Sequence, residues 1–248
     1  IAISAVGYGS TFLDVSLTPF MTAIWTIVVL WLATSLNFGG ASLTGRISSF
    51  TVWGVIAPVI VISTAGWYFF SGSLYRANWN VHNLPFSEAA TASIAMTLWA
   101  FLGLESATSN ADAVDNPERN VPIAVLGGTL GAAAIYILST NILFGILPAQ
   151  ALVDSSAPFG LAFATMFSEP VGKLVMGLLV MSCFGSLLGW QFTIANVFKA
   201  SVDQGYFPRF FSKVTRKDAP VIGMVTITLI QSAMSLMTMS PSLNEQFE

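Results

Sequence analysis

Charged residues are scarce in this 248-residue sequence: they make up 8% of it, as nine Lys or Arg and twelve Asp or Glu. Because a soluble domain carries about a quarter charged residues, this scarcity excludes an ordinary soluble fold. The hydrophobic share is 54% and the mean hydropathy is +0.74, which together indicate a chain that lies in a lipid bilayer. The net charge of -3 argues against a nucleic-acid partner, because binding to phosphates requires a basic surface.

Cysteine and histidine each occur once, as Cys183 and His82. A single cysteine excludes an internal disulfide, and we expect Cys183 to be a small buried side chain within a span. His82 has no companion at metal-ligand spacing, so neither a metal site nor a cofactor is expected. An intramembrane enzyme would need a nucleophile with its base, or a metal. We therefore expect a protein that is not an enzyme.

Long stretches without charge predict an all-α polytopic membrane protein. Crossing the bilayer takes about 20 apolar residues in a helix. Segment 1–9 is apolar but too short, and we interpret it as the second half of a span cut by the fragment boundary. Residues 1–248 are expected to form one transmembrane domain, whose six full spans are predicted at 18–36, 48–70, 89–112, 121–147, 172–199 and 219–240.

The basic residues predict the orientation, because Lys and Arg near the ends of spans favour the cytoplasmic side. One set of alternate connections holds seven of the nine, and the other set holds only Arg76 and Lys173. The span at 89–112 is thus expected to run from outside to inside. Segment 201–218, on the cytoplasmic side, mixes aromatic and basic residues, which favours a short interfacial helix with its rings in the headgroup layer.

Glu105 is the acidic residue with apolar sequence on both sides over helical lengths. A carboxylate in hydrocarbon costs roughly 3 kcal/mol or more, which marks Glu105 as a functional-site candidate. Gly103 lowers the cost of leaving helical geometry, so we predict a helix broken near this residue. Such a break turns carbonyls near Leu102 toward an ammonium group and places Glu105 at the positive end of the next half-helix. A continuous helix, in which Gly103 permits close packing, is the alternative.

Two tryptophans near the middle of their spans, Trp99 and Trp190, add surfaces that suit an alkylamine. An indole face attracts an ammonium group, and its flat surface packs against methylenes. Core packing is the alternative role for either residue. Near the cytoplasmic surface, Lys199 either extends to the headgroups or lines a vestibule with Tyr206.

Five segments, 96–107, 116–124, 127–133, 181–195 and 205–208, resemble the basic amino acid/polyamine antiporters of the amino acid-polyamine-organocation superfamily. The resemblance implies a leucine-transporter-type inverted-repeat fold, of which this chain would form about half of span 3 through span 9. It also implies that Trp99 is a gate and substrate contact and that Leu102 offers backbone at the break. Glu105 would be the substrate-coupled acid and Trp190 would line the substrate path. Lys199 and Tyr206 match positions on the cytoplasmic side of transport.

Within that family, the pattern is most similar to members that exchange putrescine for ornithine. The agmatine/arginine and cadaverine/lysine exchangers share the Trp99, Glu105 and Pro117 pattern and fit the other segments less closely. The implied activity is secondary active exchange by alternating access at the bacterial inner membrane. Proton-coupled putrescine uptake is a further implied mode, and a homodimer is a compatible assembly. From the residues alone, a cation channel is the alternative from a different class, and it would need pore-lining rings from symmetric subunits.

Overall fold

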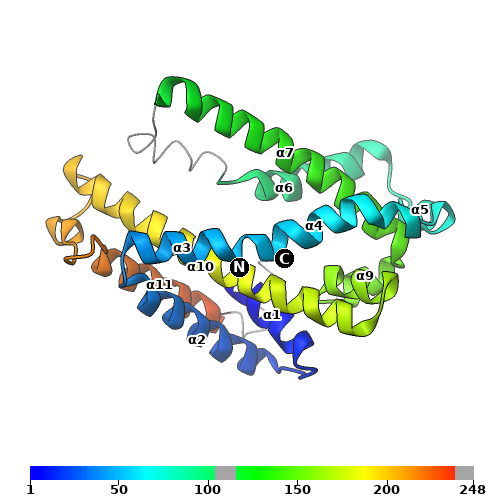
Figure 1. Ribbon diagram of the computed structural model, residues 1–248, viewed down its shortest axis with the longest axis horizontal. Helices are drawn as coiled ribbons and strands as arrows, with labels where there is room; N and C mark the ends of the chain where they lie inside the picture. Colours follow the sequence, from blue (N-terminus) through cyan, green and yellow to red (C-terminus); the bar gives the residue numbers. More distant parts are fainter. Residues whose placement is uncertain (104–115, 238–248) are drawn as a thin grey trace. The chain divides into compact units, whose positions relative to one another are not determined.

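The computed structural model describes residues 1–103 and 116–237, apart from the side chains of Ala95, Met96, Trp99 and Asp203. Within these ranges every regular element is a helix, which confirms the predicted all-α, multi-pass membrane protein (Figure 1). A helix satisfies its own backbone hydrogen bonds, as hydrocarbon requires. In chain order the elements are α1 (Ala2–Phe12), α2 (Pro19–Asn37), α3 (Ala41–Thr51), α4 (Trp53–Ala65), η1 (Gly66–Phe69), α5 (Gly72–Asn78), α6 (Phe86–Phe101), α7 (Pro117–Ile146), α8 (Ala149–Asp154), α9 (Pro158–Met166), α10 (Glu169–Asp203), η3 (Arg209–Ser212) and α11 (Val221–Met237).

Among the described residues, four helical stretches are long and apolar enough to cross a bilayer. α11 is also apolar but has only 17 residues. The four stretches are Pro19–Asn37, Ala41–Phe69, Pro117–Ile146 and Glu169–Val202. The second of these begins seven residues before the predicted span 48–70, because α3, α4 and η1 follow one another almost without a gap. The bilayer boundaries of all the spans stay predictions.

The turn between α2 and α3 requires a glycine. Gly40 has a φ of +87°, in the region that residues with a Cβ seldom adopt. A Cβ at this position would also collide with the backbone carbonyl of Lys217. The end of α2 therefore lies directly against the segment that precedes α11.

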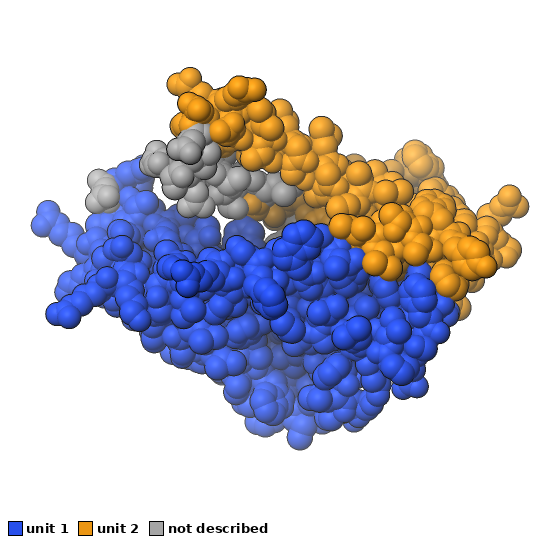
Figure 2. All heavy atoms as spheres, viewed as in Figure 1, with its two compact units in different colours: residues 1–58, 154–248 blue, residues 59–153 orange. Residues whose placement is uncertain are grey.

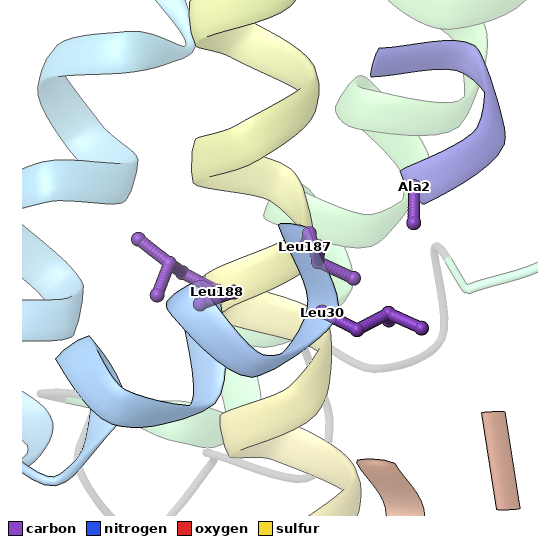
Figure 3. Packing of buried hydrophobic residues seen from close by; sticks show 5 residues of the cluster. Ala2, Leu30, Leu187 and Leu188 are labelled. Atoms are coloured by element: carbon purple, nitrogen blue, oxygen red, sulfur yellow. The ribbon is translucent and has the colours of Figure 1, made fainter. Parts of the chain in front are cut away.

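Two compact units make up the chain: Ile1–Pro58 with Asp154–Glu248, and Val59–Val153 (Figure 2). In the first unit α10 is the central helix and packs against α1, α2, α3, α9 and α11. One apolar cluster of this unit joins residues of α1, α2 and α10 (Figure 3), namely Ala2, Leu30, Ala33, Leu187 and Leu188.

Two glycines bring α10 close to its neighbours α3 and α4. A side chain at Gly185 would collide with Thr51 on α3, and one at Gly54 would collide with the backbone carbonyl of Leu178. The close approach also lets Ser48 Oγ donate a 2.8 Å hydrogen bond to the Gly185 carbonyl. Small residues of this kind allow helices to associate in a bilayer, where lipid tails are as apolar as the side chains.

The segment after α10 differs from the predicted interfacial helix. Its regular element is the short 3-10 helix η3, and its aromatic rings pack on one another. Phe198 on α10 stacks on Phe207 at a centroid distance of 4.8 Å, and the Phe211 ring lies edge-on to both. Phe210 packs on Phe211 at 4.6 Å, and Phe211 is buried. Three rings of this segment thus pack on one another and on α10, and its placement relative to the headgroups stays a prediction.

In the second unit, the C-terminal end of α7 packs against α5. The Asn78 Nδ2 donates to the carbonyls of Phe144 and Leu147, both at 2.8 Å, and its Oδ1 accepts from the Ala149 N–H at 2.9 Å. The last carbonyls of a helix lack partners within the helix, so one carboxamide satisfies groups that hydrocarbon would leave unpaired. Asn78 thereby fixes the end of α7.

Candidate functional site

The helix that carries Trp99 ends just before the predicted break. α6 stops at Phe101, Leu102 and Gly103 form a turn, and Gly103 has a φ of +97°. Glycine adopts this conformation at no steric cost, whereas other residues are strained there. The Leu102 side chain is exposed, the Trp99 side chain lies outside the described part of the chain, and so does all of Glu105. Whether a helix resumes after Gly103 therefore stays a prediction.

Tyr136 on α7 holds the end of α6. Its hydroxyl donates a 3.2 Å hydrogen bond to the carbonyl of Ala100, which is one of the carbonyls in the last turn of α6. Its ring lies edge-on to Phe101, with centroids 5.5 Å apart and an angle of 75° between the planes. The sequence pattern did not predict a role for Tyr136. The sequence does show a tyrosine within a charge-free span, and the hydroxyl of such a residue needs a hydrogen-bond partner, but the sequence does not identify that partner.

Trp190 lies on a groove of about 500 Å³ in the first unit. The indole is 36% exposed, and the groove walls are mainly apolar side chains from α1, α2, α10 and α11. Residues that line it include Leu30, Leu187, Trp190, Ile194, Gln231 and Met234. This Trp190 groove combines an indole, aliphatic walls and the carboxamide of Gln231. Such a surface suits an aliphatic stem that carries a polar end.

Directly after Trp190, Gln191 is buried in a polar network that joins three helices. Its side chain is 1% exposed. Its Nε2 lies 3.4 Å from the Thr228 hydroxyl and 3.3 Å from Gln231 Oε1, both on α11, and its Oε1 lies 3.4 Å from the Thr34 hydroxyl on α2. Asn37 extends the network, because its Nδ2 donates to Gln191 Oε1 at 3.5 Å and to the Leu188 carbonyl at 3.1 Å. The backbone that carries Trp190 is thus fixed by buried hydrogen bonds, and one of them reaches the groove through Gln231.

The sequence pattern did not predict this network either. Gln191, Thr34 and Thr228 lie within apolar stretches, where a neutral polar residue gives little signal by itself. Their one available signal is the requirement that a polar side chain in hydrocarbon must find a partner. That requirement does not say which partner.

Lys199 and Tyr206 lie at and after the C-terminal end of α10. Lys199 is partly buried, whereas Tyr206 is 78% exposed in the turn that follows the helix. The Tyr206 N–H donates to the Ser201 carbonyl at 3.1 Å, and the turn is made possible by Gly205, which has a φ of +80°. The tyrosine is therefore held close to the end of α10 by its backbone, with its side chain free to meet a solute.

The described residues thus divide the predicted site between the two units. Leu102, Gly103 and the backbone of Trp99 belong to the second unit, and Trp190, Lys199 and Tyr206 belong to the first. Cys183 is a free, partly buried thiol and His82 is exposed. In residues 1–103 and 116–237, no three His, Cys, Asp or Glu side chains gather where a metal ion could bind.

Comparison with known proteins gives consistent matches over the whole chain. The family model for amino acid permeases matches residues 1–247. The putrescine transporter PotE of Haemophilus influenzae is 68% identical over 247 residues, which cover 100% of this chain and 57% of that protein. PotE of Escherichia coli K12 is 65% identical over 247 residues, again 100% of this chain and 56% of the relative. A cadaverine/lysine antiporter of E. coli K12 is 31% identical over 237 residues, 96% of this chain and 53% of the relative. The chain therefore spans little more than half the length of the curated relatives it matches.

Proposed function

Because this chain belongs to the amino acid permease family, we propose that the whole protein is a secondary transporter of putrescine in the bacterial inner membrane. The observation that carries the proposal is 68% identity along the entire chain to a relative named as a putrescine transporter. Identity to the cadaverine/lysine antiporter is 31%. This difference favours the four-carbon diamine over the longer one. Ornithine is the proposed counter-substrate, exchanged by alternating access, with proton-coupled uptake of putrescine as a second mode.

The proposed substrate contacts are Trp99, Leu102, Glu105 and Trp190. An ammonium group would be held by the Glu105 carboxylate and by backbone carbonyls near Leu102, at the turn where Gly103 has a positive φ. The methylene stem would lie on the indoles of Trp99 and Trp190, which attract cations and pack against apolar chains. Lys199 and Tyr206 would contribute to a cytoplasmic vestibule.

The charges of the two substrates make the exchange electrogenic. Putrescine is a dication and ornithine is a monovalent cation at neutral pH, because ornithine also carries a carboxylate. Each one-for-one exchange therefore moves one net positive charge, which is worth about 2.3 kcal/mol per 100 mV of membrane potential. The direction and rate of exchange are expected to follow the imposed potential.

The test is label exchange by the full-length protein in proteoliposomes. Vesicles are loaded with ornithine, lysine, arginine or buffer, and uptake of labelled putrescine is followed with cadaverine and agmatine as competitors. Ornithine inside is expected to accelerate uptake more than lysine or arginine does. A preference for lysine and cadaverine would instead indicate the related exchanger. Uptake that is indifferent to the internal solute and does not saturate would identify a channel and overturn the proposal.

A further inference from the structure

Tyr136 on α7 contacts two consecutive residues at the end of α6, Ala100 and Phe101. The hydroxyl donates to the Ala100 carbonyl at 3.2 Å, and the ring meets the Phe101 ring edge-on at 5.5 Å. The next two residues, Leu102 and Gly103, form the turn. One side chain thus contacts a carbonyl in the last turn of α6 and the ring of its last residue.

The Tyr136 hydroxyl satisfies a carbonyl that the helix itself leaves open. In an α-helix the last four carbonyls have no partner within the helix, and in a bilayer there is little water to replace one. Because the Tyr136 hydroxyl binds it, the Ala100 carbonyl still has a hydrogen-bond partner when α6 ends at Phe101. Without this bond, the Ala100 carbonyl would need another donor. In an α-helix that donor is the N–H four residues later, so a helix that continued past Gly103 would provide it. The hydroxyl therefore favours the end of α6 at Phe101 over a continuous helix.

The Tyr136 ring also fixes the orientation of the end of α6. Edge-to-face packing against Phe101 fixes the rotation of the last turn of α6 about its axis, because a rotated helix would carry the Phe101 ring away from Tyr136. The same rotation determines where the Leu102 carbonyl points. Since Gly103 has a φ of +97°, the chain changes direction immediately after that carbonyl.

We propose that Tyr136 is a positioning residue of the transport site: through Ala100 and Phe101 it sets the end of α6 and the direction of the backbone acceptors at Leu102 that face the substrate ammonium group. This inference rests on the proposed function for its substrate. Tyr136 itself does not touch the substrate. It acts on the geometry of the residues that do.

The test compares Tyr136→Phe with Tyr68→Phe in the full-length protein. Tyr136→Phe keeps the ring and removes the hydroxyl. Tyr68→Phe is the control, because it removes the same hydroxyl from a tyrosine of the same unit that is 90% exposed. In proteoliposomes, Tyr136→Phe is expected to raise the KM for putrescine about threefold to tenfold, as loss of one hydrogen bond would, with little change in the maximal rate. Tyr68→Phe should match the parent protein in both constants.

A second measurement does not depend on the substrate. Hydrogen–deuterium exchange of the peptide that covers residues 97–103 is expected to accelerate about threefold to tenfold in Tyr136→Phe, because the end of α6 loses its partner. Phe101→Leu should accelerate the same peptide, and the double variant should exchange no faster than the product of the two single effects. Peptides from α10 should be unchanged in all variants.

The outcomes separate this inference from the proposed function. If the parent protein does not exchange putrescine, the proposed function fails, and the exchange of residues 97–103 still decides the role of Tyr136. If the parent transports putrescine but Tyr136→Phe shows the parental KM or the parental exchange of that peptide, the positioning role is wrong. A fall in thermal stability of Tyr136→Phe beyond that of Tyr68→Phe, with faster exchange throughout α7, would assign Tyr136 to general packing and also overturn the inference.

Discussion

The hydroxyl oxygens of Thr34 on α2 and Thr228 on α11 lie 2.6 Å apart, although the two residues are 194 positions apart in the sequence. Each hydroxyl also lies 2.8 Å from a carbonyl of its own helix, that of Leu30 or Met224. Each hydroxyl has one proton, so it can donate to one of these two neighbours at a time while its oxygen accepts from other groups in the network around Gln191. Hydrogen bonds between buried side chains therefore connect α2, α10 and α11, at positions that water does not reach.

Replacing Gln191 with leucine is expected to destabilise the protein. Gln191→Leu keeps a side chain of similar size and removes the carboxamide, so the hydroxyls of Thr34 and Thr228 and the carboxamide of Gln231 each lose a partner. The two hydroxyls keep the carbonyls of Leu30 and Met224 as partners, so the expected cost is that of the lost hydrogen bonds, about 0.5–1.5 kcal/mol each. The measurement is the thermal unfolding midpoint of the full-length protein in detergent. Gln204→Leu, at an exposed site just after α10, is the control; equal midpoints for the two variants would show that the network contributes nothing to stability.

Gly185→Ala should weaken the contact between α10 and α3. The new methyl group would collide with Thr51, whose Cβ lies 2.7 Å from the position it would occupy. Forcing an extra methyl into a packed contact costs about 1–3 kcal/mol. Gly189→Ala is the matched control one turn later on α10, because its methyl would meet only Ser48 Oγ at an ordinary 3.5 Å. Unfolding midpoints in detergent check the difference, and a Gly189→Ala variant as unstable as Gly185→Ala would refute the close-contact explanation.

Glu105→Gln is expected to lower putrescine transport about tenfold or more. The amide cannot supply the charge-assisted hydrogen bond to an ammonium group, which is worth about 1.5–3 kcal/mol. Glu105→Asp keeps the charge on a shorter side chain and should retain part of the activity. Glu118→Gln, at an exposed position in the first turn of α7, removes an acid elsewhere in the sequence and should transport normally. Equal initial rates for the parent, Glu105→Gln and Glu105→Asp in proteoliposomes would remove this carboxylate from the mechanism.

Phe211→Ala and Tyr206→Ala should separate stability from transport in the segment after α10. Phe211 is 7% exposed and packs against Phe198, Phe207 and Phe210, so its removal is expected to cost about 3–5 kcal/mol. Tyr206→Ala, at an exposed side chain, should change stability by less than about 0.5 kcal/mol. If Tyr206 lines a cytoplasmic vestibule, its removal should nevertheless slow ornithine exchange. Unfolding midpoints and ornithine uptake check the pair; an unstable Tyr206→Ala, or one with parental uptake, would contradict this assignment.

The helices were predictable because their signal is carried by consecutive residues. Absence of charge over 20 or more positions is visible without knowing any contact, and the stretches Pro117–Ile146 and Glu169–Val202 follow it closely. The glycine at the end of α6 was visible for the same reason, since Gly103 stands two residues before the acid. The packing of the segment after α10 was not, because Phe207 and Phe211 stack on Phe198 from a neighbouring element.

The sequence by itself determined the all-helical, membrane-spanning class and the family of this protein, because both depend on local composition and on motifs within short segments. Only the tertiary structure decided that Tyr136 holds the end of α6 and that Gln191 joins α2 to α11. A tyrosine or a glutamine in an apolar stretch must find a partner, but hydrogen-bond chemistry does not select one among many donors and acceptors. The packing of helices selects it, by bringing residues 36 to 194 positions apart within 3.5 Å.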